Sequence, residues 1–208
     1  MARVRLSVEE RRAEILRVAV EQIEARGVGN VRIADVASAL GVSGSLVLYH
    51  FSTKELLVAE AFAHAAEGDL AQLRRILDEP GTSAVRRLRS AVRWYAPTGQ
   101  AKGWRLWIEG WAAALREPAL RKVTHDLDQQ WKAAIAEVVA QGVAAGEFGC
   151  ERPADAAFRL TALLDGLAVQ TTAYQGPIER ATMLEWVDEA LVRELGVSRE
   201  DLARADRQ

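Results

Sequence analysis

The sequence predicts an all-α protein with an N-terminal three-helix helix-turn-helix domain and a larger C-terminal helical domain. Apolar residues recur every three or four positions along most of the chain, which is the spacing of an amphipathic helix. Glycine and proline interrupt this spacing at intervals, and alternating runs of the strand type are nearly absent. Half of the 208 residues are hydrophobic, so the chain can bury a core in one domain or in two small ones.

The first three helices have clear boundaries in the sequence. A helix is expected over 8–26, because Ser7 and Glu10 have the spacing of a capping box and a glycine follows the last turn. Two short helices are expected over 33–40 and 44–50, separated by Gly41.

The remaining helices are separated by proline and glycine. Ser52 and Glu55 predict a second capping box, which would open a long helix toward Asp78. The polar tail after Val197 is expected to fray. Further helices are expected over 83–95, 103–116, 118–145, 153–174 and 179–195.

Composition restricts the function classes. A formal net charge of −2 and a pI near 6.0 exclude a generally basic protein that coats nucleic acid, so any DNA contact must use a local patch. The single Cys150 cannot form an internal disulfide or a cysteine-built zinc site. No secretory signal and no apolar stretch of about 18 residues is visible. The sequence predicts a cytoplasmic protein with no membrane partner, no metal site and no cofactor.

The segment over 32–51 predicts a helix-turn-helix. Val36 and Leu40 give the first of its helices an apolar face. Gly41 can adopt the left-handed conformation that turns the chain sharply, and Ser43 can cap the next helix. Two short helices that cross steeply about a tight turn place the second one in the major groove of DNA.

The second helix of this motif is the expected DNA-reading element. Its first residues are small, so the backbone can approach DNA closely, whereas Val47 and Phe51 should face the core. An apolar side chain left on its surface can pack on a thymine methyl group, and polar ones can contact phosphates. The predicted DNA-binding residues are Arg32, Ser43, Gly44, Ser45, Leu46, Leu48, Tyr49, His50 and Lys54.

The same region carries a family resemblance, in the residues Gly41-Val42-Ser43, Tyr49-His50-Phe51 and Lys54-Glu55-Leu56-Leu57. This run resembles the signature of the TetR family of transcriptional regulators. The resemblance implies a DNA-binding domain over 1–52 and a ligand-binding and dimerisation domain over 53–208. Leu164-Asp165-Gly166-Leu167 is similar to a sequence common in the penultimate helix of that family.

The resemblance also implies a function. Family members are homodimers that bind palindromic double-stranded operators, and a small molecule usually relieves their repression. One departure concerns the DNA contact, because family members usually carry a tyrosine where Leu48 stands. Which of Leu48 and Tyr49 packs on DNA therefore stays open.

Tryptophans crowd the middle of the chain. The three over 104–111 share one helix face, and another lies on the apolar face of the next helix. Such rings form either a solid core or the walls of a pocket for a small apolar or aromatic effector, and indole faces can also hold a cation. The predicted pocket residues are Trp94, Trp104, Trp107, Trp111 and Trp131.

The last two expected helices predict a dimer interface. Two apolar helices from each subunit would make a four-helix bundle about a two-fold axis, or they simply cover the core of one monomer. Asp165 on this apolar surface needs a partner, and a structural hydrogen bond is expected there rather than ligand recognition. The predicted interface residues are Leu160, Leu164, Gly166, Leu167, Met183, Trp186, Val187 and Leu191.

Two other function classes compete with a DNA-binding regulator. An enzyme would need a nucleophile with a base, a metal set or a phosphate loop, and His50, His64 and His125 have no such partners in the sequence. A helical adaptor that binds protein alone, without DNA activity, is the remaining alternative.

Overall fold

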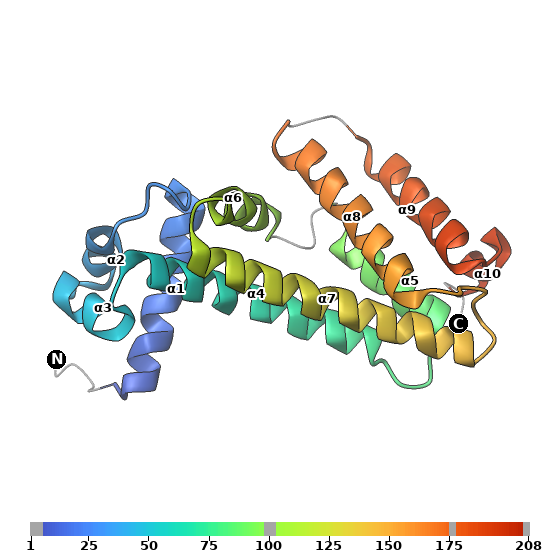
Figure 1. Ribbon diagram of the computed structural model, residues 1–208, viewed down its shortest axis with the longest axis horizontal. Helices are drawn as coiled ribbons and strands as arrows, with labels where there is room; N and C mark the ends of the chain where they lie inside the picture. Colours follow the sequence, from blue (N-terminus) through green and yellow to red (C-terminus); the bar gives the residue numbers. More distant parts are fainter. Residues whose placement is uncertain (1–5, 98–102, 175–177, 206–208) are drawn as a thin grey trace. The chain divides into compact units, whose positions relative to one another are not determined.

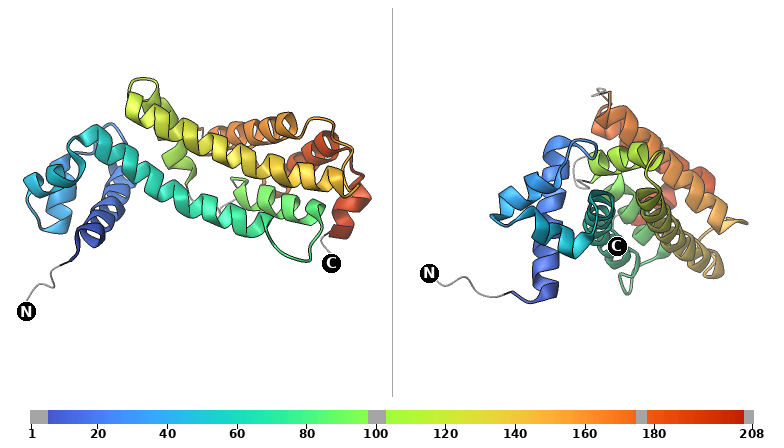
Figure 2. Two further views of the ribbon diagram at one scale, coloured as in Figure 1. Left: turned by 60° about the horizontal axis from the view of Figure 1, so that its bottom comes forward. Right: turned by 60° about the vertical axis from the view of Figure 1, so that its left-hand side comes forward.

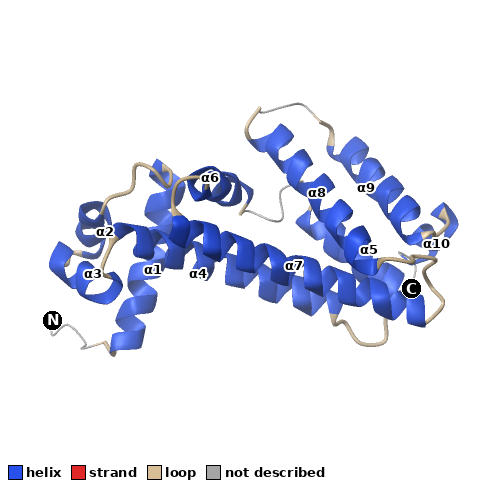
Figure 3. Ribbon diagram, viewed as in Figure 1, coloured by secondary structure: helices blue, strands red, loops and turns tan. Residues whose placement is uncertain are grey.

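The computed structural model describes residues 6–97, 103–174 and 178–205, and within these ranges every regular element is an α-helix (Figure 3). The all-α prediction is confirmed. Most helix ends lie within two residues of the expected positions. The helices are α1 (Val8–Arg26), α2 (Ile33–Leu40), α3 (Gly44–Phe51), α4 (Lys54–Leu77), α5 (Ala84–Tyr95), α6 (Trp104–Ala114), α7 (Pro118–Ala144), α8 (Pro153–Thr172), α9 (Arg180–Leu195) and α10 (Arg199–Ala205).

The chain forms two compact units, each built from two segments. The first unit comprises residues 1–68 and 105–127, and the second comprises 69–104 and 128–208. The first unit therefore extends beyond the boundary at residue 52 that the sequence predicts, and it adds the start of α4, most of α6 and the start of α7 to the N-terminal helices.

Helices α2 and α3 form the expected helix-turn-helix (Figure 1). Their axes are bent by 114° at the turn, within the range of DNA-binding motifs of this kind. Gly41 has φ 64° and ψ 38°, the left-handed conformation, and Val42 N–H closes the turn by donating to the Ala37 carbonyl at 3.0 Å. Among the described helices, no single one is long and apolar enough to span a membrane. Helices α2 and α3 reach that length and apolarity only when they are counted together, as a bent pair.

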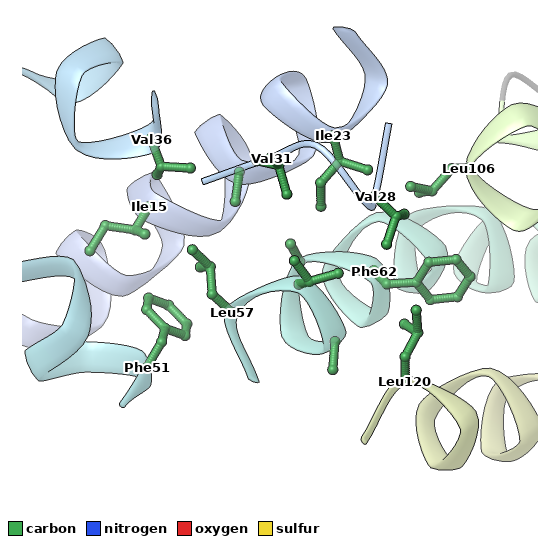
Figure 4. Close-up of a cluster of buried hydrophobic side chains, with 14 of the residues drawn as sticks. Ile15, Ile23, Val28, Val31, Val36, Phe51, Leu57, Phe62, Leu106 and Leu120 are labelled. Carbon is green, nitrogen blue, oxygen red and sulfur yellow. The ribbon is translucent and has the colours of Figure 1, made fainter. Parts of the chain in front are cut away.

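A continuous apolar core holds the first unit together. Val36 from α2 and Phe51 from α3 are buried against Ile15 from α1, and Phe62 from α4 lies beside Leu120 from α7 (Figure 4). Complete burial of each such side chain contributes roughly 1.5–3 kcal/mol to folding. The short helices α2 and α3, which would be unstable alone, are thus held by tertiary packing.

The second unit includes α5, α8, α9 and α10. Helices α8 and α9 lie side by side, drawn in orange and red (Figure 2). Buried Arg89 of α5 makes two hydrogen bonds to the Asp188 carboxylate of α9, at 3.0 and 2.7 Å, and a third to the Leu202 carbonyl of α10 at 2.7 Å. One guanidinium therefore joins three helices.

Helix α10 corrects the expectation of a frayed tail. Ser198 and Asp201 cap its start reciprocally, because the Ser198 Oγ accepts from Asp201 N–H at 3.1 Å and the Asp201 carboxylate accepts from Ser198 N–H at 3.2 Å. Leu202 is buried and anchors the helix.

Candidate DNA-reading helix and effector site

Helix α3 presents a mixed apolar and polar surface. Ser43 caps it by accepting from Leu46 N–H at 3.3 Å. Val47 and Phe51 are buried, as the sequence predicts, so the opposite face is left to solvent. On that face Leu48 is 42% exposed and Tyr49 is 76% exposed, and both can therefore reach a DNA groove.

Arg12 of α1 fixes the C-terminal end of α3. Its guanidinium donates to the His50 carbonyl, pairs with Glu60 of α4, and lies over the Phe51 ring at 4.3 Å from the ring centre. Burial lowers the pKa of His50, and the charges of Arg12 and Arg11 lower it further, so the uncharged imidazole is favoured. The sequence does not predict these contacts of Arg12, because they join residues far apart in the chain and leave no periodic signal.

The turn between α3 and α4 differs from the expected one. The predicted capping box of Ser52 and Glu55 is wrong, since Thr53 caps α4 by accepting from Leu56 N–H at 3.1 Å. Ser52 instead ends α3 with φ 62°. Lys54 becomes the first residue of α4, and its Nζ donates to the Gly29 carbonyl at 3.1 Å.

All nine predicted DNA-binding residues lie in the first unit, at or beside α2, α3 and the start of α4. The exposed members are Arg32, Ser43, Ser45, Leu48 and Tyr49. The half-buried members are Gly44, Leu46, His50 and Lys54.

The structure divides the five predicted pocket tryptophans. Trp107 and Trp111 belong to the first unit, where the Trp107 ring meets Phe62 edge to face at 4.9 Å. Trp94, Trp104 and Trp131 belong to the second unit. The spacing of the tryptophans along α6 predicts that they share one face of the helix. It cannot predict that Trp104 belongs to the second unit while Trp107 and Trp111 belong to the first.

Tyr95 is the centre of the aromatic cluster in the second unit, and the sequence analysis missed it. Its ring centre lies 4.4 Å from that of Trp104 and 4.5 Å from that of Trp131, and Trp94 stacks on Trp131 at 6.4 Å. Trp104 Nε1 donates to the Tyr95 carbonyl at 3.1 Å. We call Trp94, Tyr95, Trp104 and Trp131 the ring cluster.

Three carboxylates act electrostatically on the ring cluster, at Tyr95. Burial raises the pKa of Tyr95 well above its ordinary value, and the charges of Asp165, Asp69 and Asp128 raise it further. Tyr95 is therefore within electrostatic reach of all three carboxylates. Burial also raises the pKa of Asp165 to about 7, an effect that Asp128 increases and Lys132 opposes.

Two buried polar atoms here have no hydrogen-bond partner among the residues that the structure describes: Trp131 Nε1 and Asp165 Oδ1. Unpartnered polar atoms in a protein interior are costly and call for an explanation. Within the described part of the chain, no group donates to Oδ1 the structural hydrogen bond expected for Asp165. Aromatic faces beside ionisable carboxylates form an environment that stabilises a small organic cation.

The predicted dimer residues lie mostly inside the chain. Gly166 and Trp186 are exposed, with Trp186 at 42%. The six buried members pack in the second unit's own core: Leu160, Leu164, Leu167, Met183, Val187 and Leu191. Other apolar surface on these two helices includes Phe158, which is 57% exposed.

Two family models match the chain. The model for bacterial regulatory proteins of the tetR family matches residues 15–61, and the C-terminal model of the BetI-type transcriptional repressors matches residues 84–196. The second match alone covers more than half of the chain, and together they span both the helix-turn-helix and the ring cluster.

Relatives with similar sequences carry the same description. The chain is 26% identical to the HTH-type transcriptional regulator BetI of Ectopseudomonas mendocina, over 76% of this chain and 79% of the relative. It is 24% identical to BetI of Burkholderia thailandensis, over 85% of this chain and 89% of the relative.

Solved structures give the same result. A transcriptional regulator of Saccharomonospora viridis in complex with choline superposes with a TM-score of 0.77 and 27% identity, covering 92% of this chain and all of that one. A TetR-family regulator of a Rhodococcus species superposes with a TM-score of 0.76 and 27% identity, covering 90% of this chain and 99% of that one. The chain belongs to the TetR family of transcriptional regulators and is a ligand-responsive repressor with a C-terminal domain of the BetI type.

Proposed function

We propose that this repressor is released from its operator by a small quaternary ammonium compound of the choline type, held in the ring cluster. The relative from Saccharomonospora viridis, whose structure contains choline, supports this assignment. The proposal replaces the apolar effector expected from tryptophan content with a cation.

The observation that carries the proposal is the buried Oδ1 atom of Asp165, which has no hydrogen-bond partner among the described residues. The carboxylate that carries this atom lies within electrostatic reach of Tyr95 in the ring cluster. Lys132 opposes the rise in the pKa of Asp165 but does not offset it. A neutral apolar effector would add no positive charge here, whereas a trimethylammonium group supplies one. The same group gains cation–π attraction from Trp94, Tyr95, Trp104 and Trp131, which is worth about 2 kcal/mol or more in a desolvated site.

The packing of the ring cluster suggests how binding could be coupled to DNA release. The rings contact one another, with centres 4.4–6.4 Å apart, so an ammonium group must separate them to enter. A ligand that binds only the separated arrangement shifts the population toward it by its differential affinity. Trp104 is the first residue of α6, which links the ring cluster to the first unit along one helix.

Calorimetric titration with choline tests the effector class, with 3,3-dimethylbutan-1-ol as the matched control. The alcohol has the shape of choline but carries carbon in place of the charged nitrogen. We expect choline to bind and the alcohol to bind at least about tenfold more weakly, since the cation–π gain and the counter-charge are both lost. Equal affinities would refute the cationic effector.

A variant pair localises the site. Trp131→Leu should weaken choline binding by tenfold or more, because Trp131 contacts two other rings of the cluster. Tyr174→Leu, at an exposed aromatic residue of the second unit outside the ring cluster, is the control and should bind choline as the parent chain does. Equal losses in both variants would place the ligand elsewhere.

We propose that the chain acts as a homodimer on a palindromic operator. Two copies of α3 related by a two-fold axis can read successive major grooves if they lie about 34–36 Å apart. Exposed Phe158 of α8 and Trp186 of α9 are the apolar surface that we assign to the interface.

Two experiments test the dimer and its target. Light scattering should show a dimer that Trp186→Glu converts to monomer. Leu115→Glu, at a more exposed leucine in the first unit, should leave the dimer intact. Selection of bound sequences from random DNA should yield a palindrome. Enrichment of a single asymmetric site would contradict the symmetric arrangement.

A further inference from the structure

A polar cleft lies beside the helix-turn-helix, at the loop that joins α1 to α2. Arg26, Arg32 and Lys54 supply three cations, and Asp35 supplies the one carboxylate. Gly29 and Asn30 complete the lining. All of these residues belong to the first unit, so the cleft is built within one compact body.

The charges in the cleft are not balanced. Both oxygens of Asp35 are engaged, because Oδ2 accepts from Arg32 N–H at 3.0 Å and Oδ1 lies 3.6 Å from the Arg26 guanidinium. Lys54 Nζ donates to the uncharged Gly29 carbonyl. Among the residues that the structure describes, no carboxylate forms an ion pair with Arg32 or Lys54. Two positive charges therefore remain uncompensated.

The cleft is also preorganised on one side. Arg26 Nε donates to Gln22 Oε1 at 3.0 Å while its guanidinium faces Asp35, so two neighbours hold the side chain in place. Asn30 donates to the Arg26 carbonyl at 3.0 Å and fixes the loop. A held guanidinium loses less entropy on binding an oxyanion than a free one does.

We infer that this cleft binds one phosphate group of the operator backbone, with Arg26 as an additional DNA contact outside α3. The inference rests on the proposed DNA-binding function. Arg32 stands immediately before α2, and Lys54 follows α3 by three residues, so the cleft borders the helix-turn-helix at two points. A backbone phosphate there would fix the register of α3 without reading sequence.

The test is the salt dependence of DNA affinity. Fluorescence anisotropy of the selected operator and of an unrelated duplex, at several salt concentrations, gives the slope of log affinity against log salt. Arg26→Ala should reduce the magnitude of that slope by about 0.9 for both duplexes and lower affinity roughly fivefold near 0.15 M salt, the loss of one phosphate contact. Arg26→Lys should keep the slope.

Arg17→Ala is the matched control. Arg17 lies on the same helix, has a similarly exposed side chain, and pairs with Glu21 away from the cleft. We expect its slope to equal that of the parent chain. Thermal melting of each variant checks folding, and Arg26→Gln provides a second neutral replacement if Arg26→Ala is unstable.

The outcomes separate the phosphate sources and the two proposals. If Arg26→Ala and Arg26→Gln keep the parent slope, the inference is overturned although the chain still binds DNA. A second outcome also overturns the inference. Inorganic phosphate would raise the melting temperature of the parent chain but not of Arg26→Ala, while the two proteins show the same salt slope for DNA binding. The cleft would then be a site for a free anion. If the parent chain binds no duplex selectively, the DNA-binding proposal itself fails.

Discussion

The Glu109 carboxylate of α6 accepts a hydrogen bond from the backbone N–H of Val28 at 2.7 Å, which ties this helix to the loop after α1. Gly27 leaves room for the contact, since a side chain there would start 3.0 Å from the same carboxylate oxygen. Arg105 of α6 also pairs with Glu109, at 3.2 Å. Helix α6 is therefore fastened to the DNA-binding helices by a charge-assisted hydrogen bond within the first unit.

Replacement of Glu109 should destabilise the first unit and weaken the response to effector. We expect Glu109→Ala to lower the free energy of unfolding by about 1–3 kcal/mol, because a part-buried N–H loses its acceptor. Glu109 lies five positions after Trp104 of the ring cluster, so the variant should bind choline normally yet release the operator less completely. Urea unfolding and operator titration with choline measure the two effects.

The control for this prediction is Arg105→Ala, which removes the exposed partner of the same carboxylate. An exposed pair on one helix is worth about 0.5 kcal/mol, so this variant should stay close to the parent chain. If choline reduces the operator affinity of Glu109→Ala by the same factor as in the parent chain, the link through α6 is dispensable.

Effector affinity should rise with pH. The pKa of Asp165 is raised to about 7, chiefly by burial, and only its ionised form attracts a cation. Between pH 6 and pH 8 the ionised fraction rises about tenfold, and choline affinity should follow by a similar factor. Calorimetry in buffers of different ionisation enthalpy should also detect proton release near pH 7. A flat affinity across this range would contradict a role for Asp165.

Asp165→Asn should stabilise the free protein at high pH. The pKa of Asp165 is raised on folding, so the carboxyl favours the folded state when protonated and penalises it progressively above its unfolded pKa. The penalty grows until pH passes the folded value of about 7 and reaches at most about 4 kcal/mol. Urea unfolding at pH 8 should therefore show Asp165→Asn more stable than the parent chain, and the difference should shrink toward pH 4. No gain at pH 8 would mean that ionised Asp165 is already compensated.

The helices and the helix-turn-helix could be predicted from the sequence because their signals are local. Capping residues, apolar spacing and Gly41 are all visible within a few positions of where they act. The same kind of signal was available for α10, since Ser198 and Asp201 have the spacing of a capping box. Polarity alone suggested fraying there, and the buried Leu202 could not be foreseen without its tertiary neighbours.

The proposed effector site was only partly predictable, because its residues come from α5, α6, α7 and α8. Tryptophan content identified three of the four rings, but periodicity along a helix says nothing about which compact unit a ring joins. Asp165 illustrates the same limit. Its position on an apolar helix predicts an unusual carboxylate, whereas its place near Tyr95 and Asp128 depends on tertiary packing.

The left-handed turn at Gly41 gives a prediction that separates backbone strain from packing. A Cβ at Gly41 would meet no atom within 4 Å, so Gly41→Ala changes only the cost of holding φ at 64°. That cost is about 1–2 kcal/mol for an L-residue, and it should appear as lower unfolding free energy and weaker operator binding, since the turn sets the angle of α3. Gly68→Ala is the control, because its Cβ also meets nothing and it lies within α4, where alanine should stabilise by about 0.5–1 kcal/mol. Equal stability of the two variants, measured by urea unfolding, would show that the turn tolerates alanine without strain.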